Sequence, residues 1–96
     1  MIDRIKEMEG ILNDCRQITD DLSEKITEME ELREPMIKLF QYYGSEDWFM
    51  DREEDLPADV PAGVLSEDLV FDLITDVRDT AIQMLELSTD ILKNRI

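Results

Sequence analysis

The chain has 96 residues and a mass of 11.3 kDa, which leaves room for one small domain and excludes a second independent hydrophobic core. Its 25 acidic and 10 basic residues give a formal net charge of −15, yet 43% of its residues are hydrophobic, too many for a disordered acidic tail. The absence of His and the single Cys exclude most zinc sites, a disulfide within the chain and any His-based catalytic triad.

The first residues are charged and no apolar core follows them, so the start of the chain does not resemble a secretory signal. No stretch approaches the roughly 18 consecutive apolar residues of a membrane span, and secreted domains of this size usually carry several disulfides rather than one cysteine. We therefore expect a cytoplasmic protein without membrane contact. With a net charge of −15 it should repel nucleic acid and anionic lipid, so a partner selected by charge would be a basic protein.

Apolar residues recur in a heptad pattern from residue 5 to residue 43, which predicts a long amphipathic helix over residues 1–43. The apolar stripe is wider than the seam of a two-stranded coiled coil, and this width favours a helical bundle. Gly44 suits the end of the helix. The stripe consists of Ile5, Leu12, Ile26 and Phe40 at one heptad position, Met8, Cys15, Leu22, Met29, Met36 and Tyr43 at a second, and Ile11, Ile18, Leu32 and Leu39 at its edge.

Pro35 lies inside this predicted helix, where a proline removes one backbone hydrogen bond and costs about 3 kcal/mol. Either the helix kinks and continues, or it stops near Arg33 and a new helix begins with Pro35 in its first turn. The apolar register passes the proline without a slip, from Met29 through Met36 to Tyr43. We therefore favour one helix, kinked near Pro35.

Residues 44–65 form an acidic, aromatic connector. Ser45 predicts the N-cap of a short helix over residues 46–52, and the two prolines and one glycine of residues 56–65 predict an ordered, turn-rich loop. Residues 44–68 hold nine acidic side chains and one basic side chain. This charge is either a solvated surface that keeps the protein soluble or a docking surface for a basic protein. The candidate interaction residues are Asp47, Trp48, Asp51, Glu53, Glu54, Asp55 and Asp59.

Two features of the connector leave alternatives open. Four of the six aromatic residues lie in residues 42–49, where they form either a small core or an exposed anchor for a partner. Clustered carboxylates can also bind calcium, but the spacing from Asp47 to Asp59 lacks the alternating ligands, central Gly and terminal Glu of an EF-hand loop. We expect neither a metal nor a cofactor.

Ser66, followed by Glu67 and Asp68, predicts the start of a second long amphipathic helix over residues 66–96. Lys93 and Arg95 give its last turn the positive charge that the helix dipole favours.

The predicted fold is therefore all-α: an antiparallel helical hairpin in which a short acidic helix and an ordered loop join two long helices, within a single domain over residues 1–96. One partner helix cannot cover such wide apolar stripes. Either the first helix folds over at Pro35 or two chains pair, and we favour a homodimer that forms a four-helix bundle.

Three segments between the long helices are distinctive: Tyr42-Tyr43-Gly44-Ser45-Glu46-Asp47-Trp48, then Leu56-Pro57-Ala58-Asp59, then Gly63-Val64-Leu65-Ser66-Glu67-Asp68. In this order, and between two long helices, they resemble a family of small acidic bacterial proteins catalogued only as a domain of unknown function. The resemblance covers nearly the whole chain. It implies a small helical domain of cytoplasmic bacterial or phage origin, and it assigns no activity and no catalytic residue.

The leading hypothesis for function is a non-enzymatic protein–protein interaction module that uses the acidic connector or an apolar helical face. The alternative is an acidic inhibitor of a nucleic-acid-binding enzyme, a DNA mimic whose carboxylates stand where phosphates would sit. The net charge of −15 favours mimicry, but the 10 basic residues count against it, because those spread along the helices stabilise the helices themselves. A small enzyme is the third possibility, and the chain has no recognisable pairing of nucleophile and base.

Overall fold

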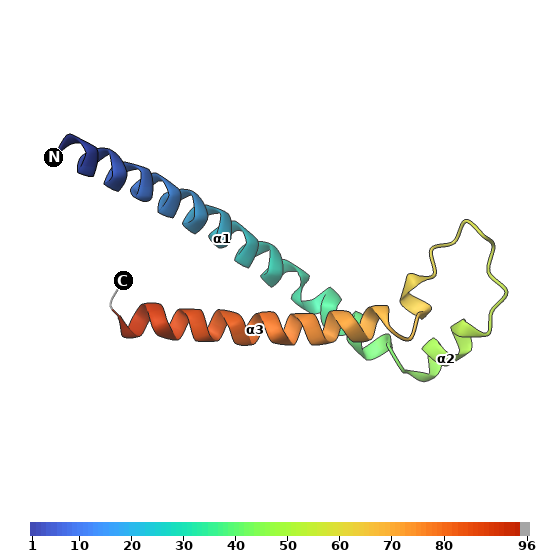
Figure 1. Cartoon of the computed structure of the whole chain (residues 1–96). Helices are drawn as coiled ribbons and strands as arrows, with labels where there is room; N and C mark the ends of the chain where they lie inside the picture. The colour runs from blue at the N-terminus through green and yellow to red at the C-terminus, as the bar shows by residue number, and fades with distance from the viewer. Residues whose placement is uncertain (95–96) are drawn as a thin grey trace. The chain divides into compact units, whose positions relative to one another are not determined.

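A computed structural model describes residues 1–94, and within that range it contains helices and no strand (Figure 1). The elements are α1 (Ile2–Tyr42), α2 (Glu46–Arg52), the short 3-10 helix η1 (Gly63–Leu65) and α3 (Leu69–Lys93). The all-α prediction is confirmed. Within residues 1–94, no helix combines the length and the apolar character that crossing a bilayer requires.

Helix α1 continues through Pro35 as one element. Proline has no N–H, so the carbonyl of Glu31 loses its usual donor. Glu31 is exposed, and water can therefore hydrogen-bond that carbonyl instead. The alternative in which a new helix begins at Pro35 is therefore wrong. The predicted kink near Pro35 stays a prediction.

The turn between α1 and α2 follows the sequence prediction closely. The backbone N–H of Tyr43 donates to the carbonyl of Leu39 at 3.1 Å, and Gly44 then adopts a φ of 76°, a left-handed conformation that favours glycine. Ser45 caps α2, since its hydroxyl accepts a hydrogen bond from the backbone N–H of Trp48 at 3.2 Å. Local turn chemistry alone therefore sets both helix ends.

The start of α3 differs from the prediction. The α-helix begins at Leu69 rather than at Ser66. The reason is that the backbone N–H of Ser66 is still bonded to the carbonyl of Gly63, so the chain leaves η1 only at that residue. Ser66 nevertheless caps the turn that follows, because its hydroxyl accepts from the backbone N–H groups of Asp68 at 3.2 Å and Leu69 at 3.4 Å.

The first half of α3 carries its buried side. Val70 is buried, and Ile74 and Val77, one and two turns later on the same face, are half-buried. Lys93 lies in the last turn of the helix, as predicted. The predicted contribution of Arg95 lies outside the described residues.

Contacts divide the chain into two compact units, Met1–Ile37 and Lys38–Ile96. In the first unit no side chain is buried, whereas the second holds both of the buried residues found in residues 1–94, Trp48 and Val70. Within the second unit, η1 contacts α2 and α3. The single domain and the antiparallel hairpin stay predictions.

Candidate functional site

The connector is organised around Trp48. Its side chain is only 4% exposed, although it comes from a helix of seven residues. The rings of Tyr43 and Phe49 approach it edge-on, with centroids at 5.0 and 4.9 Å and interplanar angles of 64° and 77°. The indole Nε1–H donates to the carbonyl of Val64 at 2.9 Å. Trp48 therefore ties α2 to η1 through this hydrogen bond and packs against Tyr43 at the end of α1.

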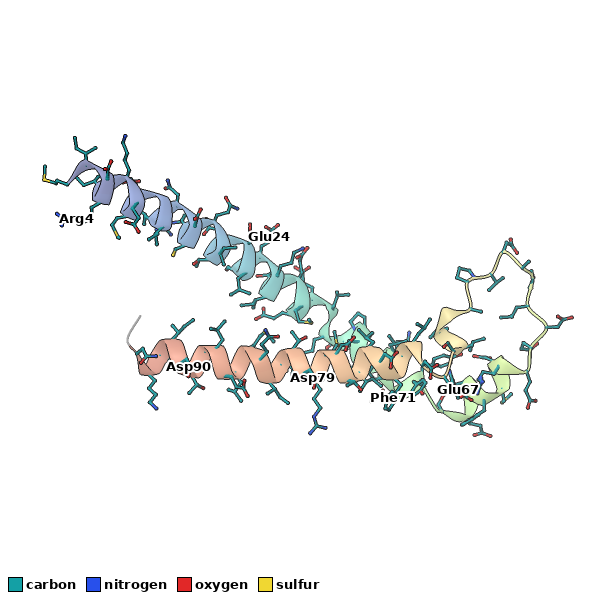
Figure 2. The ribbon with its side chains drawn as sticks, viewed as in Figure 1. Arg4, Glu24, Glu67, Phe71, Asp79 and Asp90 are labelled. Atoms are coloured by element: carbon teal, nitrogen blue, oxygen red, sulfur yellow. The ribbon has the colours of Figure 1, made fainter. Side chains whose placement is uncertain are left out.

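Arg52 also contacts this aromatic cluster. The central carbon of its guanidinium lies 4.6 Å from the centroid of the Trp48 ring, within the range of a cation–π contact. The same guanidinium lies 3.4 Å from a carboxylate oxygen of Glu67, a residue labelled in Figure 2. The Glu67 side chain is 71% exposed, so this ion pair adds little stability by itself. The single basic residue of residues 44–68 is thus already engaged with the connector.

Two tyrosine hydroxyls fix the end of α1 against the connector. The hydroxyl of Tyr43 donates to the backbone carbonyl of Glu67 at 2.6 Å. The hydroxyl of Tyr42 donates to Oδ2 of Asp51 at 2.6 Å, and this hydrogen bond is the main reason that the pKa of Tyr42 rises to about 12. The two contacts join the end of α1 to α2 and to the residues just before α3. The ordered loop over residues 56–65 stays a prediction.

The predicted interaction residues fall into two groups. Trp48 belongs to the core, so the interpretation of its ring as an exposed anchor is wrong. Its neighbour Phe49, 56% exposed, is the accessible aromatic residue of α2. The others are exposed carboxylates, of which Asp51 also accepts the hydrogen bond from Tyr42: Asp47, Asp51, Glu53, Glu54, Asp55 and Asp59.

The sequence interpretation missed the roles of Arg52 and Glu67. Arg52 is distinctive only as the single basic residue of an acidic segment, and no sequence pattern distinguishes Glu67 from the other acids. Their contact joins positions far apart in sequence, so spacing could not predict it. In residues 1–94 no three acidic or thiol side chains converge in a way that would hold a metal ion. The carboxylates of the connector instead form a dispersed negative surface.

The hollows on the described surface include three grooves, each between side chains of one helix. The lining residues are Arg4, Ile5, Met8, Glu9 and Leu12 for the first, Leu12, Cys15, Arg16 and Thr19 for the second, and Leu85, Glu86, Thr89 and Asp90 for the third. The first two follow the apolar stripe of α1. Such grooves suit a side chain from another helix better than a small substrate.

Comparison with known families gives a match over most of the chain. Residues 5–87 match the model of a family described as a domain of unknown function, DUF4298. The chain belongs to this family. The DUF4298 match includes most of α1, the whole connector and α3 as far as Leu87. The resemblance to a domain of unknown function is thus confirmed. A comparison with curated proteins finds no match.

Proposed function

We propose that this DUF4298 protein is a non-enzymatic protein–protein interaction module whose main contact surface is the apolar face of its long helices. The carrying observation is that the apolar stripe of residues 1–37 is exposed. Ile5 is 56% exposed, Met8 53% and Leu12 54%, and side chains project on every side of the α1 ribbon (Figure 2). Most helical stability in proteins comes from packing an amphipathic face, so a stripe of this length needs a partner surface.

Part of that partner surface is α3 of the same chain, in the proposed hairpin. Two short faces in the second unit support this arrangement. At the end of α1, Leu39, Phe40 and Tyr43 are half-buried, and Tyr43 lies about one helical turn after the other two. At the start of α3 the same spacing relates Val70 and Ile74. Packing of these two faces on each other, continued along both helices, would give the antiparallel hairpin, a single domain, and, on pairing of two chains, a four-helix bundle.

The acidic connector is a second candidate surface. Its exposed carboxylates repel one another, and a basic protein would relieve that repulsion on binding. The same carboxylates support the alternative function, an acidic DNA mimic that inhibits a nucleic-acid-binding enzyme. For either function, we propose that the protein is cytoplasmic, that it comes from a bacterium or a phage, and that it contacts neither nucleic acid nor membrane directly.

Salt separates the two proposals. The tagged full-length protein would be bound to its partners from a bacterial lysate at low salt and then washed at high salt. An apolar interface retains its partner in the wash, whereas a charge-driven interface releases it because salt screens the charges.

Two variants sharpen the result. Leu12→Asp disrupts the apolar stripe, and the combined Glu53→Gln, Glu54→Gln and Asp55→Asn changes remove three of the seven negative charges of the connector with side chains of similar size. We expect Leu12→Asp to lose the partner and the connector variant to keep it. Capture of basic nucleic-acid enzymes that high salt and the connector variant both abolish would overturn this proposal in favour of mimicry.

A further inference from the structure

The two long helices differ in length, and in the proposed hairpin this difference would leave one end of α1 without a partner in its own chain. Helix α1 has 41 residues and α3 has 25. At 1.5 Å per residue they are about 61 and 37 Å long. In the proposed hairpin, α3 runs back along α1 from the connector and ends at about the level of residue 18. Residues 2–18 would then extend beyond it.

This overhanging segment is apolar on one face and nearly neutral overall. Ile5, Met8 and Leu12 expose about half of their surface, and Cys15 on the same face is also exposed. Residues 2–19 hold four acidic and three basic side chains, in a chain whose net charge is −15. The segment can therefore approach a second copy of itself without the repulsion that the connector would meet.

Two hollows on the segment have the form that a second helix requires. In knobs-into-holes packing, one side chain enters a diamond of four residues at positions i, i+3, i+4 and i+7 of the facing helix. With Ile5 assigned to heptad position a, the two hollows are successive a-d-e-a diamonds, and such a diamond receives a d side chain from a parallel partner. Their residues are Ile5, Met8, Glu9 and Leu12, with Arg4 beside them, and Leu12, Cys15, Arg16 and Thr19.

We propose that residues 2–19 of α1 pair with the same residues of a second copy of this chain as a parallel, in-register coiled coil. Met8 of one copy then enters the first hollow of the other, and Cys15 enters the second. This inference rests on the proposed function and names the partner of one of its apolar faces.

Charge selects the parallel orientation. In a parallel pair, position g of one helix faces the following position e of the other, so Arg4 faces the partner's Glu9 on both sides of the pair. In an antiparallel pair, e faces e, which would place Glu9 against the partner's Glu9. Like charges in that position oppose association.

Disulfide trapping at Cys15 tests the orientation. Parallel, in-register pairing places the two Cys15 side chains next to each other across the dimer axis, at a separation that a disulfide can bridge. Mild oxidation of the full-length protein with diamide should therefore convert it to a covalent dimer on a non-reducing gel. The Cys15→Ser variant should stay monomeric on that gel. A Cys15→Ser/Gln17→Cys double variant, which moves the thiol to the outer face, should cross-link much more slowly.

Light scattering of the full-length protein tests the interface itself. The native protein should have the mass of two chains, and Met8→Asp should shift it to the 11.3 kDa of one chain. Asn13→Asp, the matched control, adds the same charge on the outer face of α1 and should leave the mass unchanged. Circular dichroism should show that both variants remain helical, and wild-type trapping tests the proposal even if Met8→Asp fails to fold.

The contradicting results are distinguishable. One contradicting result is an antiparallel dimer. Such a dimer would not be trapped by a disulfide at Cys15, but in a Cys15→Ser background a Met8→Cys chain would cross-link to a Leu12→Cys chain. This result would overturn only the present inference. A native mass of one chain at every concentration also overturns it. The proposed interaction function would then depend on a different protein, and the salt experiment above tests that case separately.

Discussion

Replacing Trp48 should loosen the connector by an amount that depends on which of its contacts is removed. Trp48→Phe keeps an aromatic ring between Tyr43 and Phe49, but it removes the Nε1–H group and leaves the carbonyl of Val64 without its donor. Leaving such a group unpaired costs about 1–3 kcal/mol. Trp48→Ala also removes the ring contacts and the cation–π contact with Arg52. Truncation of a buried tryptophan typically costs about 3–5 kcal/mol.

Native-state hydrogen exchange measures these costs where they arise. The free energy of opening should fall in α2 and in residues 63–70 in the order wild type, Trp48→Phe, Trp48→Ala. Amides of residues 2–37 should not respond, because they belong to the other unit. Met50→Ala is the matched control: Met50 is 61% exposed on the same short helix, and its loss should cost no more than about 0.5 kcal/mol. Equal effects of Trp48→Phe and Met50→Ala would refute the role of Trp48 as the centre of the connector.

Three further predictions concern single residues. Gly44→Ala should lower the free energy of unfolding by about 1 kcal/mol in thermal denaturation, because Gly44 has a φ of 76°, and Gly44→Asn should cost less; equal stability of all three proteins would contradict this reasoning. The pKa of Tyr42 is raised from 10.0 to about 12, so the stability that its hydrogen bond contributes is present below pH 10 and is lost as the pH rises through about 12. Asp51→Asn should lower that pKa in an absorbance titration, and an unchanged curve would count against the bond. Gly10→Ala should stabilise α1 by about 0.5–1 kcal/mol, because nothing lies within 4 Å of the added Cβ. It should leave the native mass unchanged, since Gly10 lies on the outer face of the proposed coiled coil, and loss of the dimer would place Gly10 in the interface.

The sequence predicts those features of the fold that local chemistry decides. The heptad register predicts α1 across Pro35, and the glycine and serine at Gly44 and Ser45 predict where one helix ends and the next begins. Each of these signals acts within one or two helical turns. The predicted start of α3 at Ser66 is three residues too early, because the backbone N–H of Ser66 still bonds to η1 at Gly63 and the α-helix begins at Leu69.

The contacts that order the connector could not be predicted from spacing. The indole of Trp48 finds its acceptor 16 residues away at Val64, and the hydroxyl of Tyr43 finds its acceptor 24 residues away at Glu67. An aromatic cluster near a turn is compatible with a core or with an exposed anchor until such acceptors are known. The exposed carboxylates were predictable as a group, because unpaired acids remain in water unless a partner compensates them.

Sedimentation equilibrium of the full-length protein at increasing salt tests the apolar interface most directly. Each chain carries a net charge of −15, so two copies repel each other, and added salt weakens that repulsion while leaving apolar contacts intact. Pairing through α1 therefore predicts a dimer with the mass of two chains. The dissociation constant of this dimer should fall as the salt concentration rises. A mass of 11.3 kDa at every salt concentration, or a dimer that dissociates as salt is added, would contradict it.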